Sequence, residues 1–407
     1  MKKCKKFLLI TLFIGLSITI VGIIFCFISG SSAFGSLLWN GESIGVFPDL
    51  FESIRDAARR DPYEGKSIYP AFAYLVCYLI SRITPGDIKV WATFSMSSNG
   101  VAVGFMFLFI CSAAIFFLTK KYLGDQIEQK LLLLLFFTSP GYLYCVERCN
   151  MVLLALVFII IFITGYDSEN KVIKEISLIS LAFAACLKIY PVLFGLLLLQ
   201  KDRIRDAIKC IIYGLLVFIL PFFSMGGISK IPVMISNILS LSLETVQDSR
   251  NFGFGYKINI ANMSNAFFEW LGKPSNIYLQ ISERLNIMLI VIALVIFIFA
   301  KKKWEKIWAI TLILTLLPGF SWIYNAVYFL VPFIVYIKEE NIYSKWMIGI
   351  NIGMILILAI FPYGYIATSL PGVNKLSIST IAVFIGAIII SASIYFRMLT
   401  DSKQAET

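Results

Sequence analysis

Long runs of apolar residues recur along almost the whole chain, and short segments rich in Lys and Arg separate many of them. A run of about 20 apolar residues is long enough to cross the hydrocarbon core of a bilayer as a helix. Only 14% of the residues are charged, against about 25% in an ordinary soluble domain. The chain is therefore predicted to fold in a membrane and not in water.

The apolar runs predict an all-α, polytopic membrane protein with about 12 transmembrane helices, some of half length. Helices are favoured because a backbone inside a bilayer must satisfy its own hydrogen bonds. The first run, from Phe7 to Ile28, exceeds the about 7–15 apolar residues of a signal peptide and is interpreted as an uncleaved first span. The later runs lie at 97–119, 131–146, 151–166, 176–187, 191–200, 210–224, 285–300, 307–318, 323–337, 346–362 and 377–396.

Most of the 35 Lys and Arg residues lie in short segments between these runs, as is typical of cytoplasmic loops. Both termini are therefore predicted to be cytoplasmic, together with the segments 120–130, 167–175, 201–209, 301–306 and 338–345. Two long segments, 29–95 and 225–284, are predicted to be external, and the apolar stretch from Tyr69 to Arg82 to lie on the membrane surface. The net charge of +11 does not predict nucleic-acid binding, because the basic residues follow this topology.

The chain contains no histidine, which excludes a His base, a His-ligated metal and a Ser-His triad. Its eight cysteines form no C-x-x-C pair, and most lie in apolar runs, where cysteine acts as a small core residue. A carboxylate is then the only plausible general base. No metal and no other cofactor is expected.

Asp49 begins a stretch of the first external segment that has the apolar spacing of a surface helix. Leu50 and Ile54 would face the membrane, and Arg55 would face water. Two interpretations of Asp49 remain open. It could cap the helix together with Glu52, three residues further on, or it could act as a base where a lipid-linked donor meets an acceptor hydroxyl.

Lys188 lies between two apolar runs, 176–187 and 191–200, each too short to cross a bilayer. A lysine near bilayer depth costs about 2.5–3.5 kcal/mol on insertion scales, so such a residue usually faces a cavity or a partner. We expect Lys188 and Tyr190 to bind the phosphate of a lipid-linked substrate, with Pro191 fixing the turn. The alternatives are a lysine that extends from a helix end into water, or one that pairs with Glu147.

Further candidates lie at the external ends of the apolar runs. Aromatic side chains suit sugar faces as well as the membrane interface, and a helix start or a turn explains several of these positions equally well. Arg148 is a candidate for the donor phosphate. The candidates for substrate binding are Tyr63, Tyr69, Asn150, Tyr256, Lys257, Trp322 and Tyr324.

Several of these residues together resemble the polyprenyl-phosphate-sugar-dependent membrane glycosyltransferases of the GT-C superfamily, and glycosyltransferase family 87 in particular. That family includes the mannosyltransferases of phosphatidylinositol mannoside assembly. The chain departs from the family pattern at Ala71, where a second proline is common, and at Glu147-Arg148, where Gly-Gln is common. The shared features, over most of residues 1–340, are Asp49 at the head of a helix ending in Asp61-Pro-Tyr63, then Tyr69-Pro70, Arg148-Cys-Asn150 and Leu187-Lys-Ile-Tyr-Pro191.

The resemblance implies a catalytic transmembrane module over 1–340, followed by C-terminal helices and a short cytoplasmic tail over 341–407. It implies inverting transfer of a hexose or pentose, with mannose as a candidate, from a polyprenyl phosphate to a lipid or glycan acceptor, with Asp49 as base. The site would lie on the external face of the cell membrane, among membrane lipids.

Two alternatives stay open. A lipid-linked glycan polymerase or ligase would rely on external arginines such as Arg148 or Arg250 instead of Asp49. A transporter or flippase would place charges at the bilayer midplane in paired repeats, whereas the charges here cluster near one face and no repeat is visible.

Overall fold

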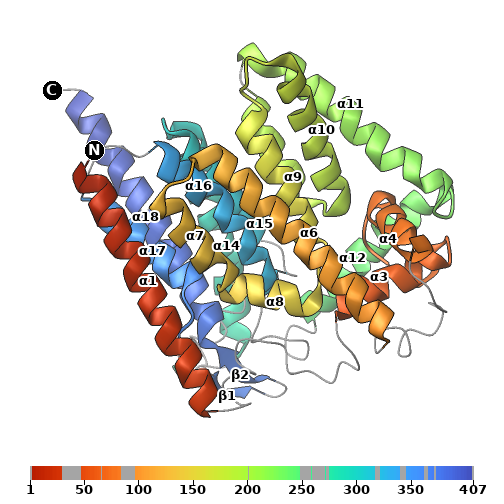
Figure 1. Cartoon of the computed structure of the whole chain (residues 1–407), viewed down its shortest axis with the longest axis horizontal. Coiled ribbons are helices and arrows are strands. Elements are labelled where there is room, and N and C mark those ends of the chain that lie inside the picture. Colours follow the sequence, from red (N-terminus) through yellow and green to blue (C-terminus); the bar gives the residue numbers. More distant parts are fainter. Residues whose placement is uncertain are drawn as a thin grey trace. The chain divides into compact units, whose positions relative to one another are not determined.

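A computed structural model describes residues 2–29, 47–65, 67–83, 97–199, 201–247, 258, 271, 275–316, 321–339, 345–361, 365–370 and 373–405. Most of these residues are helical (Figure 1). Contacts within the chain define two compact units, and each unit combines segments that are far apart in the sequence. The first unit contains Met1–Asn40, Leu123–Tyr144 and Glu244–Thr407, and the second contains Gly41–Tyr122 and Cys145–Leu243.

The second unit is helical throughout its described part. Its elements are α3 (Pro48–Ala58), η1 (Pro62–Gly65), α4 (Ala71–Ile83), α6 (Ser98–Leu123), α9 (Val152–Gly165), α10 (Lys171–Leu187), η2 (Tyr190–Leu198), η3 (Lys201–Arg203), α11 (Ile204–Ile219), η4 (Leu220–Phe223), η5 (Ile228–Lys230) and α12 (Ile231–Gln247), where η denotes a short 3-10 helix. Helix α10 packs between α9 and α11, while α3 packs on α4, which also contacts α10 and α11 (Figure 1). Helices α3 and α4, which lie within the predicted first external segment, are therefore packed on the helix bundle of their own unit.

The first unit is a second helical bundle with one hairpin. Its elements are α1 (Lys2–Ser29), α7 (Ile127–Phe137), most of α8 (Pro140–Arg148), α14 (Ser275–Phe299), α15 (Lys303–Leu316), η7 (Ile323–Phe329), α16 (Leu330–Glu339), α17 (Met347–Leu358), β1 (Tyr365–Leu370), β2 (Val373–Ser377) and α18 (Ile378–Ala405). Helix α17 packs along α18 and against α1, so both ends of the chain belong to one bundle (Figure 1). Helix α15 contacts both α14 and α16.

The described chain is helical as predicted, and one short hairpin adds to the helices. Strands β1 and β2 pair antiparallel, with Tyr365 opposite Ser377 and Ile366 opposite Leu376. In the sequence, the Pro-Gly pair at 371–372 separates the two strands and is a turn signal. A search for long apolar runs does not detect a hairpin here, because the two strands are short and lie between two expected spans.

Within the described residues, four helices are long and apolar enough to cross a membrane: Cys4–Ile28, Ser98–Leu123, Ile204–Phe223 and Ile378–Thr400. A fifth candidate is the pair α7 and α8, which is bent by 52°. The bend falls at Pro140, which has no N–H to continue the helical ladder. The chain is accordingly a membrane protein, and the expectation of about 12 spans stays a prediction.

The outer surfaces of the longest helices support this conclusion. Phe105, Phe109 and Phe117 of α6 are all more than half exposed, and so are Ile211 and Leu215 of α11. In water, apolar surface of this extent would favour aggregation, whereas in a bilayer it meets lipid chains. These faces therefore fit a hydrocarbon environment.

Several polar groups inside the first unit are paired between helices. Glu305 of α15 and Arg397 of α18 form an ion pair whose side chains are 3% and 6% exposed. Asn351 of α17 donates to Thr11 of α1 at 3.1 Å and accepts from the Tyr336 hydroxyl at 3.3 Å. Contacts of this kind fix how helices pack in an apolar environment.

Candidate active site

Asp49 lies in the first turn of α3, but it does not cap that helix. The N-cap residue is Phe47, in the left-handed region with φ 54°, and it makes no side-chain cap bond, while Pro48 takes the first helical position. Gly104 of α6 leaves room for the Phe47 ring, which would collide with any Cβ there. The interpretation of Asp49 and Glu52 as a capping pair is therefore wrong, because the packing of Phe47 fixes where the helix begins.

The Asp49 carboxylate accepts hydrogen bonds from two residues about 100 positions further along the chain. The Arg148 guanidinium, at the end of α8, donates through Nε (2.8 Å) and Nη2 to Oδ1. The buried Asn150 amide donates to Oδ2. The Asn150 oxygen accepts from the Val152 backbone N–H at 3.0 Å, which turns its amide nitrogen toward Asp49.

The two oxygens of the Asp49 carboxylate accept different numbers of hydrogen bonds. A carboxylate oxygen accepts about two hydrogen bonds. Two N–H groups of Arg148 fill Oδ1, whereas Asn150 supplies one donor to Oδ2. The Asp49 and Arg148 side chains remain 15% and 20% exposed, respectively. Oδ2 is thus the oxygen with capacity for a further donor such as a substrate hydroxyl.

Lys188 lies at a break between two helices, as the sequence predicts. Helix α10 ends at Leu187, Lys188 is extended, and η2 begins at Tyr190. The Lys188 side chain is almost fully buried, its Nζ donates to the Tyr69 hydroxyl at 2.9 Å, and it stands 4.2 Å from the centre of the Tyr69 ring. Tyr69 also interacts electrostatically with Tyr190. Lys188 and Tyr69, two of the predicted site residues, are therefore in direct contact.

The two groups lie in the same region of the second unit. The Asp49 carboxylate and the Lys188 ammonium both act electrostatically on the Cys145 thiol of α8. Cys145 is thus within electrostatic range of both the candidate base and the candidate phosphate ligand. A carboxylate can activate a nucleophile, and an ammonium can stabilise a leaving anion.

Tyr63 is a buried framework residue in this unit. Its ring stacks on Phe222 at 5.4 Å and lies edge-on to Tyr74 at 5.9 Å, and its hydroxyl donates to the Tyr69 carbonyl at 3.1 Å. Burial, together with nearby Asp61, raises the pKa of this hydroxyl well above its usual value, so it remains a donor. These contacts position Tyr69, and binding of substrate by Tyr63 itself stays a prediction.

The remaining candidates lie elsewhere. Trp322 and Tyr324 belong to the first unit, where both rings stack on Tyr144, with centroids 6.2 Å and 6.0 Å away. Tyr256 and Lys257 lie outside the described residues. Their roles stay predictions.

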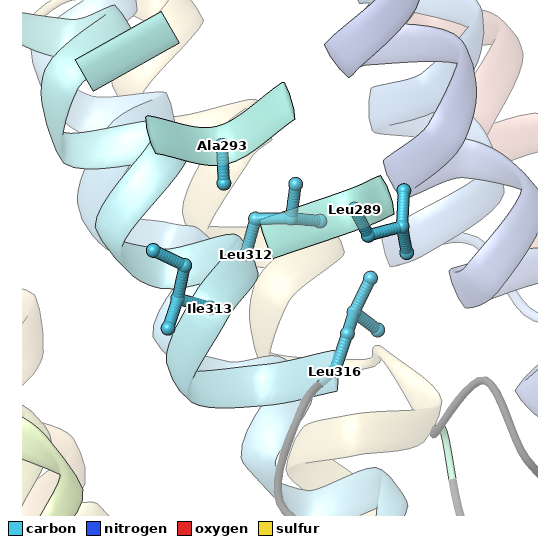
Figure 2. A pocket seen from close by; sticks show the side chains of 5 residues that line it. All are labelled: Leu289, Ala293, Leu312, Ile313 and Leu316. Carbon is cyan, nitrogen blue, oxygen red and sulfur yellow. The ribbon is translucent and has the colours of Figure 1, made fainter. Parts of the chain in front are cut away.

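A small hollow between α14 and α15 carries no chemistry. Figure 2 shows its lining side chains, all of them aliphatic. A site that orients a sugar or a phosphate needs a few convergent polar groups, and this hollow has none. The residues that line it are Leu289, Ala293, Leu312, Ile313 and Leu316.

A family model for glycosyltransferase family 87 matches residues 68–323, well over half of the chain. The chain belongs to glycosyltransferase family 87. The resemblance inferred from sequence motifs is thereby confirmed, and this family 87 member is a membrane glycosyltransferase that acts on a sugar donor and an acceptor. Tyr69, Arg148, Asn150 and Lys188 lie inside the matched range, whereas Asp49 precedes it. Comparison with curated proteins and with solved structures gives no match.

Proposed function

We propose that this family 87 glycosyltransferase moves a hexose or pentose from a polyprenyl-phosphate donor to a hydroxyl of a lipid or glycan acceptor, with inversion. One observation carries the proposal: the second unit contains both a partly exposed carboxylate, Asp49, held by Arg148 and Asn150, and a buried ammonium, Lys188, bonded to Tyr69. The first group suits proton abstraction, and the second suits a phosphate.

In the proposed reaction the acceptor hydroxyl donates to the open position on Asp49 Oδ2. Its proton moves to that oxygen as the acceptor oxygen attacks the anomeric carbon. The bond from this carbon to the phosphate oxygen breaks on the opposite face, so the configuration inverts. The polyprenyl phosphate leaves as a monoester and takes the bonding electron pair.

Lys188 stabilises that leaving group. The phosphate gains negative charge as the bond breaks, so a fixed ammonium stabilises the transition state more than the bound donor. Tyr69 orients the ammonium, and Tyr190 supplies a second hydroxyl nearby. Arg148 orients Asp49 through its two N–H groups, and the predicted contact of Arg148 with the donor phosphate would come from the rest of its guanidinium.

The wider architecture is part of the proposal. We place both termini in the cytoplasm and the site on the external face, in a GT-C-like arrangement of about 12 spans, some of half length. The contact between Asp61 and Lys230 supports one face for both long segments, because it joins 29–95 to 225–284 at 2.5 Å. Trp322, Tyr324, Tyr256 and Lys257 would contact the sugar or the acceptor, without a metal or another cofactor.

The decisive experiment offers the purified full-length chain, in lipid nanodiscs, a choice of donors. Polyprenyl-phosphate mannose and polyprenyl-phosphate glucose are compared with GDP-mannose and UDP-glucose, with a membrane lipid extract as acceptor. We expect transfer from a polyprenyl-phosphate sugar alone. Transfer from the nucleotide sugars alone would refute the proposed donor class.

The membrane face is tested separately by labelling single cysteines in intact cells. Seven of the eight native cysteines are buried, which keeps the background low. A cysteine at Glu64, whose side chain is 77% exposed, should react with an impermeant reagent from outside. A cysteine at Lys302 should not react, and its labelling from outside would overturn the topology.

A further inference from the structure

The segment between α3 and α4 is held by a residue that no sequence motif marks. The Asn237 amide of α12 donates through Nδ2 to the Tyr63 carbonyl at 3.3 Å and to the Ser67 carbonyl at 3.1 Å. One side-chain nitrogen with two hydrogens thus bridges two backbone oxygens that lie four residues apart. This bridge fixes the course of the chain immediately before Tyr69.

This segment has a second attachment to the chain around α12. Lys230, in the 3-10 turn that precedes α12, pairs with Asp61 at 2.5 Å and reaches Glu64 at 3.8 Å. Gly226, with φ 89°, allows this approach, because a Cβ there would stand 2.9 Å from Asp61 Oδ1. Asp61 and Glu64 are therefore held by Lys230, and the Tyr63 and Ser67 carbonyls by Asn237.

The same segment also leads to the proposed phosphate site. The Tyr63 hydroxyl donates to the Tyr69 carbonyl at 3.1 Å, and the Tyr69 hydroxyl accepts from Lys188 Nζ at 2.9 Å. Three hydrogen bonds, joined through the covalent frames of Tyr63 and Tyr69, therefore connect the Asn237 amide to the ammonium. Displacement of the Tyr63–Ser67 backbone would move the hydroxyl that aligns Lys188.

We infer that Asn237 is a positioning residue for the donor phosphate and acts through Tyr69 on Lys188. The inference rests on the proposed role of Lys188. Asn237 donates to two backbone carbonyls, so we expect its effect to pass through the backbone that it holds. Loss of the bridge should weaken recognition of the charged phosphate and leave recognition of the lipid chain intact.

The test measures binding of polyprenyl phosphate, and of uncharged polyprenol, to the full-length chain in nanodiscs. Asn237→Ala should weaken polyprenyl phosphate binding about 3–10-fold, the effect of losing an ordinary hydrogen bond or two. Its binding of polyprenol should not change. Ser236→Ala, at the exposed neighbouring position on α12, is the matched control and should bind both lipids normally.

A double-mutant cycle separates positioning from general support. Tyr69→Phe removes the hydroxyl between Lys188 and the held segment. If Asn237 acts through that hydroxyl, Asn237→Ala should add little in a Tyr69→Phe background. Additive losses, or equal losses of polyprenol and polyprenyl phosphate, would overturn the inference. Asn237→Ser keeps one donor and gives the same comparison if the alanine variant does not fold.

The Lys188→Gln variant separates a failure of the proposed function from a failure of the proposed role of Asn237. Normal polyprenyl phosphate binding by Lys188→Gln would refute the proposed function itself. Weakened binding by Lys188→Gln together with unchanged binding by Asn237→Ala would refute the role of Asn237 alone.

Discussion

Both units bury charged side chains, but the partners of these charges and their exposure to solvent differ between the units. In the first unit, Glu305 and Arg397 pair with each other between α15 and α18 and are almost fully hidden. In the second unit, the Asp49–Arg148 pair lies at helix ends and remains partly exposed, and Lys188 contacts a tyrosine hydroxyl. A hidden pair can only support packing, whereas a partly open pair with a free lone pair can meet a substrate.

The largest effect on transfer is expected from a substitution in the partly exposed Asp49–Arg148 pair. Asp49→Asn removes the basic oxygen but keeps an oxygen for Arg148, so transfer should fall by about 10²–10⁴-fold while the protein still inserts. Transfer rate and elution as a monodisperse particle are measured together. Glu52→Gln, an exposed carboxylate one turn further along α3, is the control. Normal transfer by Asp49→Asn would show that another group is the base.

Substitutions in the buried Glu305–Arg397 pair should lower the free energy of unfolding and leave the rate of sugar transfer unchanged. Glu305→Leu leaves Arg397 buried without its carboxylate, which should cost about 3–5 kcal/mol of unfolding free energy. The double variant Glu305→Leu/Arg397→Met should recover most of this loss, measured by thermal unfolding in detergent. Folded protein should transfer sugar at the normal rate. If Glu305→Leu slowed transfer without lowering stability, the pair would have a role in catalysis and not in packing.

Lys188 sharpens the comparison because it is buried yet placed at the proposed site. Lys188→Gln keeps length and polarity but removes the charge, so transfer should fall about 10²–10³-fold. Stability of the protein should change little. Normal transfer by Lys188→Gln, or restored stability in the Lys188→Gln/Glu147→Gln double variant, would make Lys188 a structural ion-pair partner.

The smallest expected effect concerns the neutral polar contacts of the first unit. Thr11→Val removes the hydroxyl that accepts from Asn351, and such contacts between membrane helices contribute about 0.6 kcal/mol on average. The loss should appear as a small decrease in unfolding temperature with an unchanged transfer rate. Ser17→Ala, on the exposed side of the same helix, should have no effect; an equal decrease would show that the Asn351 contact contributes nothing.

The sequence predicted the elements that depend on local patterns. Apolar runs located the long helices, and two short runs located the break at Lys188, because both signals lie in consecutive residues. Local patterns could not show that Arg148 and Asn150 hold Asp49, since these residues are 99 and 101 positions away. Each was expected to touch substrate separately.

Two other features depend on packing that a linear pattern does not contain. The start of α3 is set by the Phe47 ring against Gly104 of α6, and this overrode the capping pattern at Asp49. Asn237 lies in helix α12 (Ile231–Gln247), inside the long segment 225–284 that the sequence analysis did not divide into helices. Its importance comes from two backbone carbonyls in another segment, and no residue type signals such a contact.

The contact between Lys188 and Tyr69 affects both the stability of the fold and the rate of turnover. Lys188 is only 7% exposed, so its ammonium loses most of its hydration shell once, when the chain folds. The ring and hydroxyl of Tyr69 replace that water before any donor arrives, and no catalytic cycle has to strip it again. A variant that lets Lys188 relax into solvent should therefore resist unfolding better while it turns over more slowly.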